Sequence, residues 1–255
     1  MPPRAAEAFV LDTAPWRERD KLVTLFTESD GKVRGIAHGA ARSVKRFGGR
    51  LERLNRVRVG YFEKEGQDLV RLDDVELVEQ AFALQKEIVV AASLAYVSEI
   101  AGEFVREKEP DRRYYRLVGA TIEAFRGGAE AKVALGYFEY WTARLHGIFP
   151  DLEACDRCGA LLSGQGARIS VNEGSAMCPG CARGDAGRTL PLSAGALTVA
   201  ATLRRARPAT LAGVTFPGRA LEELAAATRS ALVSFVGHAF QSSAFLDQIL
   251  VEPRP

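Results

Sequence analysis

Residues 22–37 read LVTLFTESDGKVRGIA, which is the pattern of two strands joined by a tight turn. Leu22 to Phe26 is rich in strand-favouring residues, and an extended pattern resumes between Val33 and Ala37. Between them, Asp30-Gly31 is a dipeptide typical of hairpin turns. This stretch therefore predicts a β-hairpin near the N-terminus.

Further short strands surround this hairpin between residues 8 and 78. In one of them, Val57, Val59 and Tyr61 alternate with basic or small residues, so one face is apolar and the other is partly basic. The segment Glu65-Gly66-Gln67-Asp68 separates that strand from an apolar run at residues 69–72. Five short strands in so short a region favour a small closed barrel.

The apolar pattern changes to a helical period after about residue 84. Val90, Leu94, Val97, Ala101 and Phe104 are spaced by three or four residues, as on one face of a helix. Two further helices follow from the patterns at residues 134–148 and 221–239, and Ser193 is a predicted N-cap for a helix through Arg205. Helices on both sides of residues 150–191 are expected to share a core, because their apolar faces need partners.

All four cysteines lie in that intervening segment, as two C-x-x-C pairs: Cys155, Cys158, Cys178 and Cys181. Two residues between thiols let one turn present both sulfur atoms to one ion, and zinc favours four thiolates in a tetrahedron. The pattern predicts one structural Zn²⁺ in a closed site. A redox dithiol or simply buried cysteines are the alternatives.

Together these patterns predict an α+β protein with three parts. An N-terminal β-barrel spans residues 1–80. An all-α domain comprises residues 81–150 and 190–251, and a four-cysteine zinc ribbon at residues 151–189 is inserted into it. No apolar run is long enough for a signal peptide or a membrane span, so a cytoplasmic location is expected.

Basic residues are concentrated between residues 32 and 58. This segment contains nine basic residues and one acidic residue, Glu52, so its net charge is +8. The whole chain has a net charge of only +2. Such asymmetry is typical of a surface that binds a phosphate backbone. The predicted DNA-binding residues are Lys32, Arg34, Arg42, Lys45, Arg46, Arg50 and Arg53.

Residues 39–50 read as a flexible loop in this basic stretch. Phe47 within it has two possible roles, stacking on a base or packing in the core. The acids Glu99, Glu103 and Glu107 recur every four residues, which predicts a solvated helix face. No nucleotide-binding P-loop, catalytic triad or clustered carboxylate site is present, so an enzyme is not expected.

The order and spacing of several short motifs resemble those of the RecO family of bacterial recombination mediators. The motifs are Ala8-Phe9-Val10-Leu11 with Pro15-Trp16, Gly31-Lys32-Val33-Arg34, Ala37-His38-Gly39-Ala40, the run from Leu145 to Leu152, and Val236-Gly237-His238. The resemblance implies that the barrel is an OB-fold. In this chain Ala40-Ala41 precede Arg42, where the family usually has a basic residue.

The resemblance also implies a function without bond chemistry. RecO-like proteins bind single- and double-stranded DNA, anneal complementary strands, and help load RecA onto DNA coated by single-stranded-DNA-binding protein, without ATP, in the RecFOR pathway. The implied partners are RecR, the C-terminal tail of the single-strand binder and, indirectly, RecA, with nucleoid association. The alternative is a zinc-ribbon scaffold whose basic face docks an acidic protein.

Overall fold

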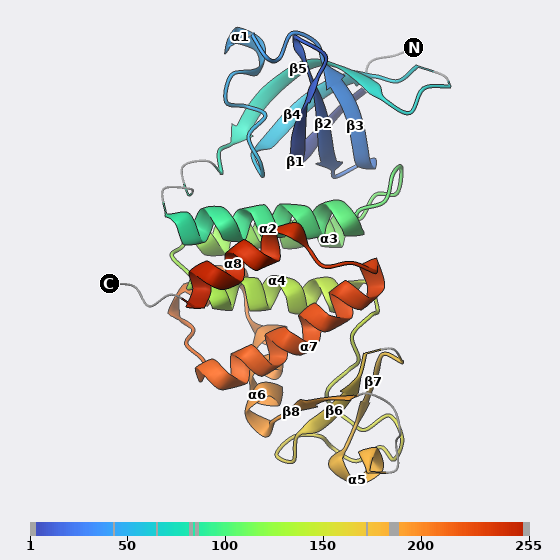
Figure 1. Ribbon diagram of the computed structural model, residues 1–255, viewed down its shortest axis with the longest axis vertical. Coiled ribbons are helices and arrows are strands. Elements are labelled where there is room, and N and C mark those ends of the chain that lie inside the picture. The colour runs from blue at the N-terminus through green and yellow to red at the C-terminus, as the bar shows by residue number, and fades with distance from the viewer. Residues whose placement is uncertain are drawn as a thin grey trace. The chain divides into compact units, whose positions relative to one another are not determined.

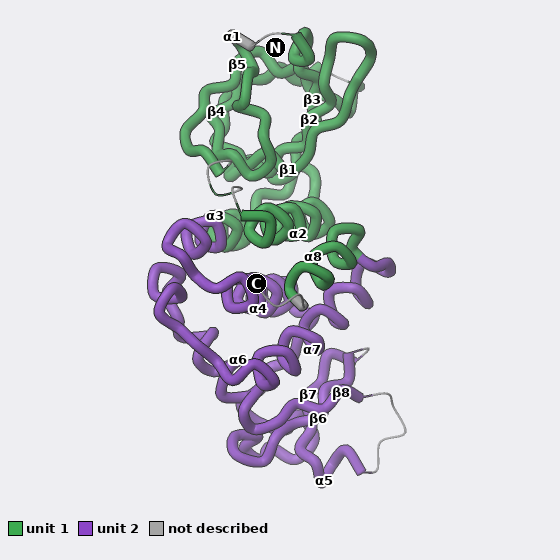
Figure 2. The backbone as a smooth tube through the Cα atoms, turned by 60° about the vertical axis from the view of Figure 1, so that its left-hand side comes forward, with its two compact units in different colours: residues 1–118, 240–255 green, residues 119–239 purple. Residues whose placement is uncertain are grey.

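The computed structural model describes residues 4–42, 44–64, 66–81, 84, 87–171, 173–183 and 189–251. At positions 44, 45 and 251 it describes the backbone but not the side chain. The chain forms two compact units. Unit 1 comprises residues 1–118 and 240–255, and unit 2 comprises residues 119–239 (Figure 2). None of the helices in the described ranges is both long and apolar enough to cross a membrane.

The N-terminal part of unit 1 is a closed barrel of five strands, which confirms the prediction (Figure 1). The strands are β1 (Arg4–Trp16), β2 (Asp20–Thr27), β3 (Gly31–Ala37), β4 (Arg56–Phe62) and β5 (Val70–Glu79). Their order around the barrel is β1-β2-β3-β5-β4, and only the β3–β5 pair is parallel. This arrangement is OB-like.

Alternation along the strands fills the barrel interior with apolar side chains. Val10 on β1 lies opposite Leu25 on β2, which in turn lies opposite Val33 on β3, and all three are buried. At the β2–β3 turn, Gly31 has a φ of +66°, and a Cβ there would lie 2.3 Å from the Glu109 carbonyl oxygen. This position therefore requires glycine.

The outer face of β1 and β2 is apolar as well around Phe9 and Phe26, and helices cover that part of it. Phe9 lies 4.7 Å from Tyr115 between ring centroids, and Phe26 lies 5.3 Å from the same ring. Tyr115 is in the first turn of α3 (Arg112–Arg126). Ser98, on α2 (Ile88–Phe104), donates a hydrogen bond of 2.6 Å to the Leu11 carbonyl oxygen. The barrel and these helices consequently share one packed unit.

The predicted solvated helix face is wrong for Glu99, which is half-buried, and Glu107 is exposed as predicted but does not belong to the helix. Both carboxylate oxygens of Glu99 accept backbone N–H groups at the start of α8 (Gln241–Val251), at 2.7 Å from Gln241 and 2.8 Å from Ser242. A carboxylate there satisfies N–H groups that the helix leaves free. Glu107 lies beyond the end of α2 and forms a β-bridge with Gly31.

Unit 2 packs helices from both sides of the cysteine segment together, as predicted. They are α4 (Ala131–Leu145), α6 (Ala194–Arg205) and α7 (Gly218–Val236), with a 3₁₀ turn at Pro208–Gly213. Ser193 caps α6, because its hydroxyl oxygen accepts the Ala196 N–H at 3.2 Å. Arg229 on α7 donates to the buried Glu139 carboxylate of α4 at 3.0 Å, which joins the two helices.

The cysteine segment forms a small antiparallel sheet of order β7-β6-β8 and a short helix. The elements are β6 (Ala167–Ser170), β7 (Ser175–Met177), α5 (Pro179–Ala182) and β8 (Thr189–Leu192). The division into domains at residues 80, 150 and 189 stays a prediction.

Candidate metal centre and nucleic-acid interface

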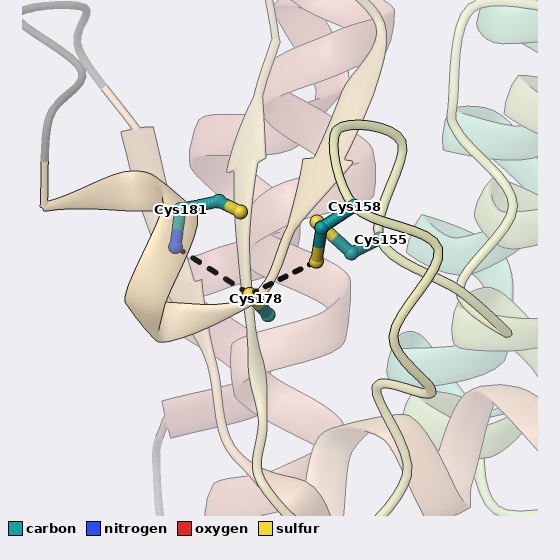
Figure 3. Close-up of side chains that lie close together, drawn as sticks. All are labelled: Cys155, Cys158, Cys178 and Cys181. Atoms are coloured by element: carbon teal, nitrogen blue, oxygen red, sulfur yellow. Dashed lines mark hydrogen bonds between the residues drawn. The ribbon is translucent and has the colours of Figure 1, made fainter.

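The four cysteines converge, although nineteen residues separate Cys158 from Cys178. Their sulfur atoms all lie within 4.8 Å of one another (Figure 3). Cys155 and Cys158 come from a turn before β6, whereas Cys178 and Cys181 flank the start of α5. Such a closed set of four sulfur atoms could hold a single tetrahedral metal ion, with no position left for a substrate.

The backbone of each pair is folded for this purpose. In the first pair, Gly159 has a φ of +72° and its N–H donates to the Cys155 carbonyl oxygen at 2.8 Å. In the second pair, Cys178 is the N-cap of α5, and its sulfur accepts the Cys181 N–H at 3.4 Å. Each turn therefore directs two sulfur atoms to the same point.

Because the four thiols lie close together, they differ in pKa. Hydrogen bonding from the backbone of Cys178 is the main effect that lowers the pKa of Cys155 to about 6. Hydrogen bonding with Cys158 and then Cys178 raises the pKa of Cys181 to about 12. One thiolate disfavours the next, because like charges repel in a small volume. A divalent cation at the centre would favour the thiolate form of all four, so the residues fit a metal.

The two residues inside the first pair link it to the second. Asp156 exchanges two hydrogen bonds with Ala176 of β7: its N–H donates to the carbonyl oxygen at 2.9 Å, and its carboxylate accepts the Ala176 N–H at 2.6 Å. Arg157 donates to the Cys181 carbonyl oxygen at 3.1 Å. These three bonds fix the distance between the two cysteine pairs.

Three of the predicted DNA-binding residues, Lys32, Arg34 and Arg53, line one cleft of about 710 Å³ between the barrel and α2. Lys32 donates to the Gly102 carbonyl oxygen at 2.8 Å, and Arg53 pairs with Asp12 at 3.2 Å. Four carboxylates line the same cleft: Asp12, Glu99, Glu103 and Glu107. In this cleft, acids therefore oppose the cations.

The other four predicted residues lie between β3 and β4. Arg42 is exposed and forms no ion pair with any residue that the structure describes. Arg46 donates to the Asp73 carbonyl oxygen, and Arg50 donates to the Val75 carbonyl oxygen at 3.2 Å, so both hold the segment against β5. Lys45 belongs to the short helix α1 (Val44–Phe47), and its side chain is outside the described part.

The expected flexible loop is thus partly helical, and Phe47 belongs to the core. Phe47 is only 3% exposed and packs in the cluster that fills the barrel interior. The Arg46 guanidinium carbon lies 4.9 Å from the centroid of its ring. Base stacking by Phe47 is excluded in this conformation, because no face of the ring is available.

Arg56 and Arg58 are neutralised on the outside of β4. Arg56 pairs with Glu7 at 3.4 Å and with Glu79 at 3.1 Å. Arg58 pairs with the same Glu7 at 3.4 Å and with Glu76 at 3.2 Å. The charge that is concentrated in the sequence is therefore divided among several surfaces.

The structure adds two cations that the sequence reasoning missed, Arg17 and Arg19. Both are exposed in the turn between β1 and β2. The Arg19 carbonyl oxygen accepts the Ala41 N–H at 3.1 Å, which joins this turn to the segment that carries Arg42. The available signal was the pattern Arg-Glu-Arg in a hairpin turn directly before a strand.

Comparisons with known proteins agree with this architecture. The family model "Recombination protein O N terminal" matches residues 1–81, and "Recombination protein O C terminal" matches residues 85–244. A DNA repair protein RecO from Anaeromyxobacter sp. (strain K) is 36% identical over 240 residues, 94% of each chain. Another from Geobacter sulfurreducens is 31% identical over 249 residues, 98% of this chain and 99% of that protein.

Removal of the Asp156 side chain tests how the metal centre is held. Asp156→Ala should lower the affinity for added Zn²⁺ about 10- to 100-fold, because hydrogen-bonding groups next to metal ligands hold those ligands in position. Asp156→Asn should lose less, since its amide oxygen still accepts the Ala176 N–H. The measurement is competition with a chelator.

Glu173→Ala is the matched control, since this exposed acid of the same module accepts a bond from Ser175 at 3.4 Å and from no other residue that the structure describes. Equal affinities for Asp156→Ala and Glu173→Ala would show that the cysteines alone hold the ion.

Proposed function

Because the chain belongs to the RecO family, we propose that this DNA repair protein is a recombination mediator that anneals complementary strands and helps to load RecA. The substrate is single-stranded DNA coated by single-stranded-DNA-binding protein, and double-stranded DNA binds as well. No step breaks or forms a covalent bond, and none requires ATP. The proposed location is the cytoplasm, with association to the nucleoid.

The observation that carries this proposal is a group of cations at one end of the barrel. Arg17, Arg19 and Arg42 are exposed, and none of them forms an ion pair within the described part of the chain. The Arg19–Ala41 backbone bond keeps the two segments together. OB-folds commonly bind nucleic acid with such connecting loops and the neighbouring strands.

Annealing follows from the electrostatics of this group. Two DNA strands repel one another, and bound cations lower that repulsion and release counterions, which supplies free energy without a nucleotide. Arg42, Lys45, Arg46 and Arg50 of the β3–β4 segment are the proposed contacts from the sequence prediction. Lys32, Arg34 and Arg53 are further proposed contacts; Lys32 and Arg53, like Arg46 and Arg50, also have partners within the protein.

The metal is proposed to be one structural Zn²⁺. Four sulfur atoms within 4.8 Å of one another are the donor set that zinc prefers, and they close the coordination sphere. The ion would hold the two C-x-x-C turns on the small sheet of unit 2. It would contribute to stability rather than to DNA chemistry.

The proposed partners are RecR, RecA indirectly, and the C-terminal tail of the single-strand binder. Unit 2 offers a groove of about 690 Å³ that suits such a tail. Its lining includes Leu152, Leu161, Leu197 and Val214, with Arg205 beside them. A C-terminal peptide always carries a terminal carboxylate, so an apolar floor next to an arginine can take both its last side chain and its charge.

The competing function is a scaffold whose cations dock an acidic protein. Both functions use the same charges, so the salt dependence of DNA binding separates them. If about six phosphates are contacted, the logarithm of duplex affinity should fall against the logarithm of salt concentration with a slope of about −5.

The combined variant Arg42→Ala, Lys45→Ala and Arg46→Ala should flatten that slope to about −3, because three phosphate contacts are lost. The measurement is fluorescence anisotropy of labelled duplex at several salt concentrations. The control removes three helical cations, Arg126, Lys132 and Arg219, and should keep the slope of the parent protein. Equal slopes in both triple variants would refute the barrel interface.

The groove is tested by Leu161→Asp. Leu161 is 69% exposed, so the substitution should leave the fold intact while it removes apolar contact and adds a repelling carboxylate. A labelled tail peptide should bind about tenfold more weakly. Leu77→Asp, at an exposed site on β5, is the matched control. Unchanged peptide affinity for Leu161→Asp would place the tail elsewhere.

A further inference from the structure

Trp16 is the last residue of β1 and lies beside the proposed DNA contacts. It is half-buried, and it neither stacks on another aromatic ring nor donates a hydrogen bond to any described residue. Core tryptophans usually find a partner for the indole N–H. A large aromatic side chain therefore remains partly accessible at the end of the barrel.

The strand register places Trp16 on the outside of the barrel. Val23 on β2 is buried in the core, and it lies opposite Thr13 on β1. Trp16 lies three residues beyond Thr13 and opposite Asp20, so its side chain points to the other face. Ala14, two residues before Trp16, is on the same outer face and lies opposite Leu22.

An apolar strip continues from Trp16 across the next strand. Leu22 lies opposite Ile36 of β3, and both side chains are half-buried. Ile36 lies opposite Arg71 of β5 through the parallel pair. The outer faces of the second and third strands of an OB-fold are a common site for oligonucleotides.

Exposed cations lie near this strip, in two joined loops and on β3. Arg17 and Arg19 follow Trp16 directly in the turn, and Arg42 is joined to them through the Arg19–Ala41 bond. Arg34 is exposed two residues before Ile36 on the same strand.

Three acids lie in the same region. Asp20 already accepts from His38 at 2.9 Å and from the Gly39 N–H at 2.8 Å, and Asp73 pairs with Arg71 at 3.6 Å. Glu18 is exposed between the two turn arginines. The cations outnumber the acids that remain available.

We propose that the Trp16 indole stacks on a base of single-stranded DNA while Arg17, Arg19 and Arg42 hold the adjoining phosphates. This inference rests on the proposed DNA binding and adds a reason for preference between strands. Every base has a π-face, so the stack does not depend on sequence. A duplex hides those faces between its own base pairs, so only single strands gain from Trp16.

Intrinsic fluorescence can report the contact directly. The chain has only two tryptophans, Trp16 and Trp141, so the Trp141→Phe variant leaves Trp16 as the single reporter. Addition of oligothymidylate should quench its emission. An oligomer of abasic sites with the same number of phosphates should bind through charge but leave the emission nearly unchanged.

Affinity gives the second readout. In anisotropy titrations, Trp16→Ala should bind oligothymidylate about tenfold more weakly, from the usual contribution of one stacked base. Its affinity for duplex and its salt slope should match those of the parent protein, because no charge changes. Trp16→Phe should keep most of the single-strand affinity.

The outcomes separate the two proposals. If the parent protein binds neither DNA form, the proposed function fails. If it binds DNA but Trp16 is not quenched and Trp16→Ala binds single strands like the parent, the stacking inference alone is overturned. If circular dichroism shows that Trp16→Ala does not fold, the other two variants provide the test. Stacking then requires quenching by oligothymidylate in Trp141→Phe and near-parental single-strand affinity in Trp16→Phe, and it is overturned if the quenching is absent.

Discussion

The outer face of β1 and β2 is too apolar to be left in water. Phe9, Leu11 and Phe26 are buried there, on the side of the strands away from the barrel interior. Tyr114 and Tyr115 of α3 cover the two phenylalanine rings, and α2 bonds to the Leu11 carbonyl oxygen. Burial of large aromatic side chains is among the strongest contributions to such packing.

This packing decides which part of the barrel can meet a ligand. The helices cover the Phe9 half of β1, whereas the Trp16 half and the β1–β2 turn stay accessible. Lys32, Arg34 and Arg53 face a cleft lined with carboxylates, while Arg56 and Arg58 are paired with Glu7, Glu76 and Glu79. The cations best placed for phosphate are those of the two loops joined by the Arg19–Ala41 bond. The proposed function therefore depends mainly on these exposed cations.

Local patterns in the sequence were sufficient for the barrel strands and for α2, α4, α6 and α7, but not for α1 or α3. The alternation at Val57, Val59 and Tyr61, the Ser193 cap and the convergence of the four cysteines follow from spacing over a few residues or from one known ligand chemistry. Contacts between residues far apart in the sequence could not be predicted from such local patterns. The Glu99 contact with Ser242 spans 143 positions, and Glu7 reaches Arg58 across 51. Phe47 was ambiguous because only the closed barrel shows that its ring fills the interior.

The most informative measurement is complementary-strand annealing without ATP, since annealing requires the exposed cations to bring two polyanions together. The protein should accelerate annealing above the rate of the DNA alone, both with bare strands and with strands coated by the single-strand binder. Rising salt concentration should remove the acceleration. A rate no higher than that of protein-free DNA at low salt would show that the exposed cations do not promote annealing.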